Sequence, residues 1–192
     1  TAYEIRLSLV GSEMCIRDSQ IYPAPVLRKK AAKIPAVTEE IRAFAAAMLR
    51  IMRLEEGIGL AAPQVGVSLR MFIVDVPPTD KRSFEVDPPT ATNGPFVYIN
   101  PKLSSPLGAI LPDEEGCLSL PDIRGDVLRA PTITITATNL QGEAFTQTGT
   151  GLLARCWQHE YDHLDGVLII DKMVQMSRIK NRAAIRDLEQ SD

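Results

Sequence analysis

The chain contains little of several residue types that often carry chemistry or cross-links. It has two histidines, three cysteines and one tryptophan among 192 residues. An odd, small number of cysteines does not predict a disulfide framework and fits a reducing compartment better. No apolar run approaches the roughly 18–20 residues that cross a bilayer, which argues against a membrane protein. The formal net charge of −3 argues against a DNA-binding protein that relies on bulk positive charge.

The length and composition predict one domain. Hydrophobic residues make up 45% of the chain, which is enough for one core. A length of 192 residues is short for two ordinary domains. Residues 7–19, LSLVGSEMCIRDS, resemble translated sequencing-adapter read-through, and a short targeting segment fits them poorly. We therefore predict that residues 1–19 are a non-native or disordered extension and that residues 20–192 form the single domain.

The helical signals are clear in three places. Thr38 is a suitable N-cap, apolar residues then recur at three- and four-residue steps, and Gly57 is a suitable stop. Residues 151–164 predict a second helix, with Gly166 as its stop. A terminal helix is predicted from Gln175 onward.

The strand signals are short and separated by turns. Pro101 should end one strand, residues 139–143 read as a hairpin turn, and the proline-rich residues 77–95 read as a surface loop. Strands are predicted at residues 70–76, 96–100, 132–137, 144–148 and 167–171. The pattern predicts an α+β fold in which short, mostly antiparallel strands pack around a central helix, with a further helix at the C-terminus.

The strongest local signal is the run His159-Glu160-Tyr161-Asp162-His163. Residues four apart lie on the same face of a helix, so the two imidazoles can bind one metal ion while Glu160 exchanges a proton with its water. Both histidines of the chain fall here, on a helix that the hydrophobic pattern predicts independently. The alternative is a chance match on an amphipathic helix.

A catalytic tetrahedral site normally has three protein ligands, and no third histidine exists. The candidates for the third ligand are Cys117, Cys156 and Glu189. Cys156 is better explained as a small core residue, and the alternative for Cys117 is a buried thiol. The residues alone leave open a metalloprotease that uses Glu189 and a closed structural metal site.

Three segments resemble the peptide deformylase family: GIGLAAPQVG at 57–66, EGCLSLP at 115–121 and QHEYDHLDG at 158–166. The entry YPAPVLR at 22–28 is similar as well, and the resemblance covers about residues 20–170. It implies a metal-dependent hydrolase that removes the N-formyl group from the first methionine of nascent polypeptides and releases formate.

The resemblance also implies roles for particular residues. The metal ligands would be Cys117, His159 and His163. Glu160 would be the general acid and base, and the oxyanion site would use the Gln64 side chain and the Leu118 N–H group. The positions implied to bind substrate are Ile58, Gly59, Gly116, Arg124, Leu152 and Cys156. The apolar members of this set are equally explained as core, and Arg124 as a solvated surface residue.

The implied cofactor is one divalent metal ion. The family typically uses Fe²⁺, and a Cys-His-His set also suits Ni²⁺, Co²⁺ or Zn²⁺. The implied partners are N-formylmethionyl nascent peptides, in a bacterial cytoplasm or alternatively in an organelle. Basic residues near the C-terminus would be available to contact the ribosome beside the exit tunnel, although a solvated helix face is the simpler explanation. They are Lys172, Arg178, Lys180, Arg182 and Arg186.

Overall fold

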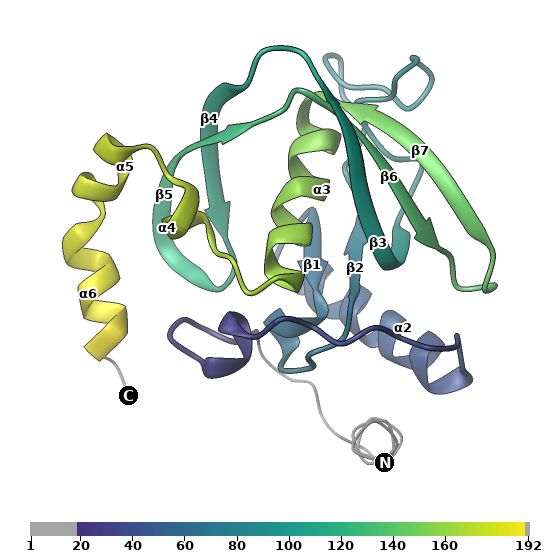
Figure 1. The fold of residues 1–192 in the computed structure, drawn as a ribbon, viewed down its shortest axis with the longest axis horizontal. Coiled ribbons are helices and arrows are strands. Elements are labelled where there is room, and N and C mark those ends of the chain that lie inside the picture. Colours follow the sequence, from purple (N-terminus) through teal and green to yellow (C-terminus); the bar gives the residue numbers. More distant parts are fainter. Residues whose placement is uncertain (1–18, 191–192) are drawn as a thin grey trace.

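The computed structural model describes residues 19–190, with helix α3 (Gly151–Leu164) at the centre (Figure 1). The strands are β1 (Gly59–Ala61), β2 (Met71–Val74), β3 (Phe96–Leu107), β4 (Leu111–Cys117), β5 (Leu120–Arg129), β6 (Thr132–Thr138) and β7 (Ala144–Thr150). One sheet has five strands in the order β1-β2-β3-β6-β7, and β4 and β5 form a separate two-stranded sheet. Every neighbouring pair is antiparallel. The predicted α+β fold with strands around a central helix is confirmed.

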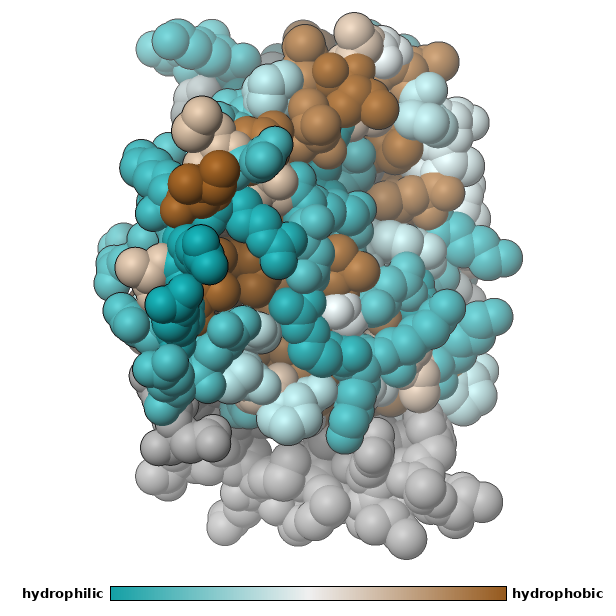
Figure 2. All heavy atoms as spheres, turned by 60° about the vertical axis from the view of Figure 1, so that its left-hand side comes forward, coloured by the Kyte–Doolittle hydropathy of each residue, from teal (hydrophilic) through white to brown (hydrophobic). Residues whose placement is uncertain are grey.

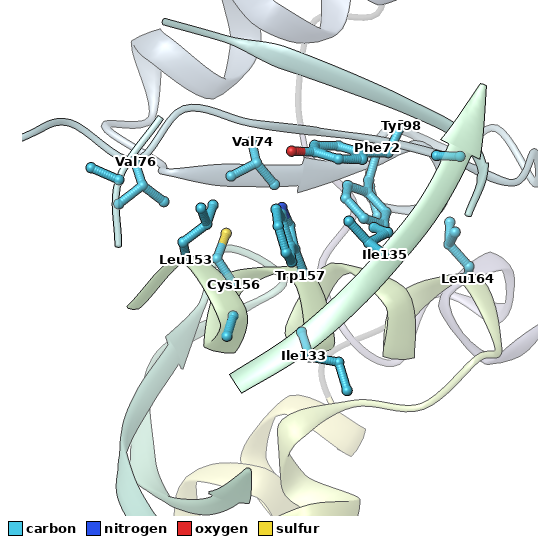
Figure 3. Close-up of a cluster of buried hydrophobic side chains, with 14 of the residues drawn as sticks. Phe72, Val74, Val76, Tyr98, Ile133, Ile135, Leu153, Cys156, Trp157 and Leu164 are labelled. Atoms are coloured by element: carbon cyan, nitrogen blue, oxygen red, sulfur yellow. The ribbon is translucent and has the colours of Figure 1, made fainter. Parts of the chain in front are cut away.

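The main core lies between α3 and the five-stranded sheet (Figure 3). Trp157 on α3 is fully buried, and its ring centroid lies 5.7 Å from that of Tyr98 on β3. Gly149 on β7 has to be glycine here, because a Cβ would meet the Trp157 ring at 2.7 Å. This apolar packing fixes α3, and the residues 151–164 predicted as a helix are confirmed to the residue.

Helix α2 (Glu39–Leu54) begins after Thr38, as predicted. Its end is not at Gly57: the helix stops at Leu54, and Glu56 adopts the left-handed conformation, with φ of 54°. The left-handed residue after a helix is usually a glycine, but here it is Glu56. The Gly57 N–H group then bonds to the Met52 carbonyl at 2.8 Å and closes the turn. The buried face consists of Ile41, Phe44, Ala45, Met48, Ile51 and Met52.

The prediction that Pro101 ends a strand is wrong, because β3 continues through it to Leu107. The pairing of β3 with β6 shifts register between Ile99 and Lys102, and Asn100 has a φ of 51°. A proline is tolerated at such an irregularity because its missing N–H group removes no regular ladder bond. The predicted turn at residues 139–143 and the loop at 77–95 are confirmed.

The β4–β5 hairpin was not predicted. The first four residues of β4 are exposed, and its sequence LPDEEGC is acidic and lacks an apolar alternation. Pairing with β5, from Leu111 opposite Arg129 to Cys117 opposite Leu120, forms the strand instead. The hairpin carries Cys117 at the end of β4, followed by a two-residue turn of Leu118 and Ser119.

The predicted strand at 167–171 is wrong, since the segment forms the short helix α4 (Ile169–Lys172). Asp171 Oδ2 accepts a hydrogen bond from the Leu168 N–H at 2.8 Å, which satisfies the helix start. The C-terminal helix is confirmed but is two helices, α5 (Gln175–Lys180) and α6 (Arg182–Gln190). Periodicity does not separate a short apolar strand from a short buried helix.

Two further predictions concern the chain as a whole. Within residues 19–190, no helix combines the length and the hydropathy that a bilayer crossing requires. The extension predicted at residues 1–19 falls outside the described residues apart from Ser19, so it stays a prediction.

Candidate metal centre

Three potential ligands from two elements meet between the hairpin and α3. Cys117 comes from the end of β4, and His159 and His163 stand one turn apart on α3. Cys117 Sγ lies 3.3 Å from His163 Nε2, which lies 3.3 Å from His159 Nε2. The three ligand atoms all lie within 4.8 Å of one another. The structure thus brings together residues that are more than forty positions apart in the chain.

The donor set fits a divalent transition metal. Bonds of about 2.0–2.3 Å from one tetrahedral ion place thiolate and imidazole ligands roughly 3.3–3.7 Å apart, and the observed Sγ–Nε2 and Nε2–Nε2 spacings are compatible with this. Thiolate and imidazole donors suit iron, nickel, cobalt and zinc better than magnesium or calcium. The alternative third ligands lie elsewhere: Glu189 accepts a hydrogen bond from Tyr22 at 2.9 Å, and the Cys156 thiol faces the Ile58 carbonyl at 3.7 Å.

Glu160 lies beside these ligands without a fixed hydrogen-bond partner. It is 3% exposed, and within the described part of the chain its Oε2 atom is buried and unpaired. The pKa of Glu160 is raised to about 7: burial is the main cause, His159 opposes it and Glu115 adds to it. An orphaned buried carboxylate at this place fits a site that receives a water molecule or a substrate group.

Gly59 on β1 makes room for that carboxylate. A Cβ at position 59 would collide with Glu160 Oε1 and would lie 2.8 Å from Cys156 Sγ. The pKa of the Cys156 thiol is raised by burial, so this cysteine stays neutral. The glycine is therefore required by close approach rather than by a turn.

Gln64 presents its amide nitrogen toward the ligands. Its Oε1 atom accepts a hydrogen bond from the Ala61 N–H at 2.8 Å, which sets the orientation of the amide. Its Nε2 atom then lies 3.7 Å from Cys117 Sγ and 3.4 Å from Ser119 Oγ. Leu118 lies next to Cys117 in the hairpin turn. The Gln64 amide is thus a side-chain N–H donor next to the cysteine.

These groups lie along a pocket of about 460 Å³. Every predicted site residue except His163 lines it: Ile58, Gly59, Gln64, Gly116, Cys117, Leu118, Arg124, Leu152, Cys156, His159 and Glu160. His163 is buried beneath them, at 1% exposure. Arg124 is exposed, with its guanidinium against Gly116.

A buried ionic network behind His159 was not predicted from the sequence. Glu115 is 6% exposed and Arg129 is 3% exposed, and the two form a bidentate pair at 2.9 and 3.0 Å. Burial would raise the pKa of Glu115, but hydrogen bonds from His159 and Arg129 hold it well below its usual range. The one available signal was that Glu115 precedes Cys117 by two residues, which places both on the same face of a strand.

Comparisons with known proteins agree with this geometry. The model of the polypeptide deformylase family matches residues 16–179. Peptide deformylase 2 of Gloeobacter violaceus is 43% identical over 160 residues, which are 83% of this chain and 77% of that protein. Peptide deformylase of Acidobacterium capsulatum is 42% identical over 178 residues, 93% of this chain and 98% of the relative.

Solved structures show the same fold. The inhibitor complex of Plasmodium falciparum peptide deformylase superposes with a TM-score of 0.78 at 30% identity and covers 91% of this chain and 100% of its own. Peptide deformylase of Thermotoga maritima gives a TM-score of 0.72 at 36% identity, with 81% of this chain and 96% of that one covered. The chain belongs to the polypeptide deformylase family and has the peptide deformylase activity of that family.

Proposed function

We propose that this site hydrolyses the formyl amide of N-formylmethionyl peptides with Glu160 as the general acid and base. The observation that carries the proposal is the convergence of Cys117, His159 and His163 with the unpaired Glu160 carboxylate at one pocket. A divalent metal held by the three ligands supplies Lewis-acid chemistry, which polarises a carbonyl and lowers the pKa of water toward neutrality.

Glu160 moves the protons of the reaction. Its carboxylate accepts a proton from water as the water oxygen bonds to the formyl carbon. It returns that proton to the amide nitrogen as the carbon–nitrogen bond breaks, which releases formate and a free amino terminus. The unpaired Oε2 atom supports this role because no hydrogen bond in the described structure holds it back.

Gln64 and Leu118 stabilise the negative charge that develops on the formyl oxygen. The Gln64 Nε2 group is preset by the bond between its Oε1 atom and the Ala61 N–H. Donors that are already oriented cost no reorganisation when the charge appears, and one such donor is worth about 10²–10³-fold in rate. The Leu118 N–H group is the second donor that we propose, because it follows Cys117 directly.

The pocket binds the methionine side chain and the first part of the peptide. Ile58, Leu152 and Cys156 supply its apolar lining, and Gly59 and Gly116 leave room for substrate backbone. Arg124 on the rim of the pocket is exposed and is placed to meet peptide carbonyl groups.

Fe²⁺ is the metal that we propose, within a compartment that keeps Cys117 reduced, such as a bacterial cytoplasm. A thiolate ligand to iron is sensitive to oxidation, so metal analysis should follow purification without oxygen. Iron in excess of nickel, cobalt and zinc supports the proposal, and zinc alone in protein purified this way contradicts it.

Contact with the ribosome is a second proposal, supported by the surface of the C-terminal helices. A shallow groove along α5 and α6 is lined by Arg178, Arg182 and Arg186, and the face that carries these helices is mostly hydrophilic (Figure 2). Because Ile185 and Leu188 pack against the core, deleting the helices would disturb the fold. Replacing the three arginines by glutamate tests the idea, and unchanged co-sedimentation with ribosomes would reject it.

A deformylation assay tests the main proposal. Metal-loaded protein should release formate from formyl-Met-Ala and leave acetyl-Met-Ala and internal peptide bonds intact. Glu160→Gln should keep bound metal and lose most of the activity, on the order of 10²–10⁴-fold. The matched control is Glu143→Gln, an exposed change in the β6–β7 turn. Full activity in Glu160→Gln, or equal hydrolysis of the acetyl peptide, contradicts the proposal.

A further inference from the structure

We propose that Glu115 is a positioning residue that fixes the ring orientation and the tautomer of His159. This inference rests on the proposed function only in requiring that the site bind a divalent ion. Glu115 lies on β4, and its side chain is 5% exposed. Its Oε2 atom lies 3.0 Å from His159 Nδ1, the ring nitrogen opposite the one that faces His163.

The carboxylate of Glu115 is surrounded by donors. Arg129 contributes Nε at 2.9 Å and Nη2 at 3.0 Å, and Arg155 contributes Nη1 at 2.8 Å. An ionised carboxylate accepts hydrogen bonds and cannot donate one. His159 Nδ1 must therefore carry the proton in this bond, which leaves the lone pair on Nε2, the atom that belongs to the ligand group.

The same network connects the hairpin to α3. Arg129 on β5 also contacts the Asp162 carboxylate and the Gln158 carbonyl, both on α3. Arg155 on α3 donates to the Val127 carbonyl at 2.9 Å. Arg129 thus reaches from the hairpin to α3, and Arg155 reaches from α3 to the hairpin. Both arginines and His159 bond to the same acceptor, Glu115.

The two histidines differ in this respect. Within residues 19–190, His163 Nδ1 is buried and has no hydrogen-bond partner, whereas His159 Nδ1 has Glu115. A carboxylate behind a ligand imidazole fixes its orientation and raises its basicity, and loss of such a partner typically weakens metal binding about 10–100-fold. The assignment therefore concerns His159 alone and can be tested against His163 in the same molecule.

Metal affinity of a matched pair of variants is the first test. Glu115→Gln keeps the size of the side chain but replaces one acceptor oxygen with an NH₂ group, which cannot accept the hydrogen bonds that the arginines and His159 donate. Titration with Co²⁺, followed by its visible absorption, should show affinity about 10–100-fold weaker, with a changed spectrum. Asp113→Asn removes the same charge from the same strand, yet its side chain is 72% exposed and lies 3.6 Å from Arg155, so its Co²⁺ affinity should not change.

The outcomes separate this inference from the proposed function. Glu115→Gln that binds Co²⁺ as tightly as the unsubstituted protein overturns the positioning role, whatever the activity. An unsubstituted protein that binds Co²⁺ but does not deformylate contradicts the proposed function, while the comparison of variants still decides the role of Glu115. A purely structural role would lower the thermal stability of the metal-free protein and leave the Co²⁺ spectrum as it is.

A second measurement needs no variant. The chain has two histidines, so long-range ¹H–¹⁵N spectra of the Zn²⁺-loaded protein contain few imidazole signals. His159 should show an Nδ1 proton shifted strongly downfield by the Glu115 carboxylate, and any Nδ1 proton of His163 should lack that shift because it has no acceptor. A His159 ring protonated on Nε2, or a His159 Nδ1 proton with the same shift as that of His163, overturns the inference.

Discussion

The two sides of α3 are built from different chemistry. Toward the five-stranded sheet the helix presents apolar side chains such as Leu153 and Trp157, both 2% exposed or less. Toward the β4–β5 hairpin it presents Arg155, His159 and Asp162, which make hydrogen bonds and ion pairs. Apolar burial is non-directional and supplies most of the stability, whereas hydrogen bonds fix distances and angles. The sheet side therefore stabilises the fold, and the hairpin side sets the metal geometry.

The largest expected effect is on the sheet side. Trp157→Ala removes a fully buried ring and should lower the free energy of unfolding by about 3–5 kcal/mol, as measured by urea denaturation. Below its own transition, the variant should still bind Co²⁺. Leu54→Ala, at an 83% exposed position, is the control and should change stability by less than about 0.5 kcal/mol. A Trp157→Ala variant as stable as the parent would contradict the claim that the sheet side of α3 stabilises the fold.

The next largest effect is expected at Gly59 on β1, which packs against Glu160 and Cys156 of α3. Gly59→Ala places a methyl group against Glu160 and Cys156, so overpacking should cost about 1–3 kcal/mol of stability. Displacement of the Glu160 carboxylate should reduce kcat for formyl-Met-Ala by about 10²-fold. Ser104→Thr adds one methyl group at an exposed position of β3 and should alter neither quantity. Unchanged kcat in Gly59→Ala would show that Glu160 tolerates movement.

The smallest effect is expected on the far side of the sheet from α3. Thr136 and Thr146 share a hydrogen bond at 3.0 Å between β6 and β7 in an exposed position. Thr136→Val should cost less than about 1 kcal/mol, because a cross-strand pair contributes roughly 0.2–1 kcal/mol. Co²⁺ affinity and kcat should stay at the values of the parent. A change in metal affinity would mean that the two sides of α3 are coupled through the sheet.

The same division explains what could be predicted from the sequence. The α3 helix follows from a regular apolar spacing and a glycine at each end, so its bounds, Gly151–Leu164, were predicted correctly. The histidine pair follows from a spacing within that helix. Cys117 was one of three open candidates until the resemblance to a family favoured it, because spacing within one element says nothing about a ligand from another.

The hairpin side was harder to predict because its contacts join distant parts of the chain. Glu115 meets His159 across 44 positions and Arg129 across 14, and neither contact has a local signature. The β4 strand is formed by pairing rather than by an apolar face, so the hydrophobic pattern did not predict it. The strand predicted at residues 167–171 was wrong for another reason, because a short apolar run suits a buried helix and a buried strand equally.

Metal binding by Cys117→Ala and Cys156→Ala tests the central claim most directly. Both substitutions remove a thiol near the same pocket, but only Cys117 belongs to the ligand group. The account predicts that Cys156→Ala retains stoichiometric Co²⁺ or iron, while Cys117→Ala loses it together with deformylation of formyl-Met-Ala. Metal bound to Cys117→Ala with the affinity of the unsubstituted protein would contradict the account.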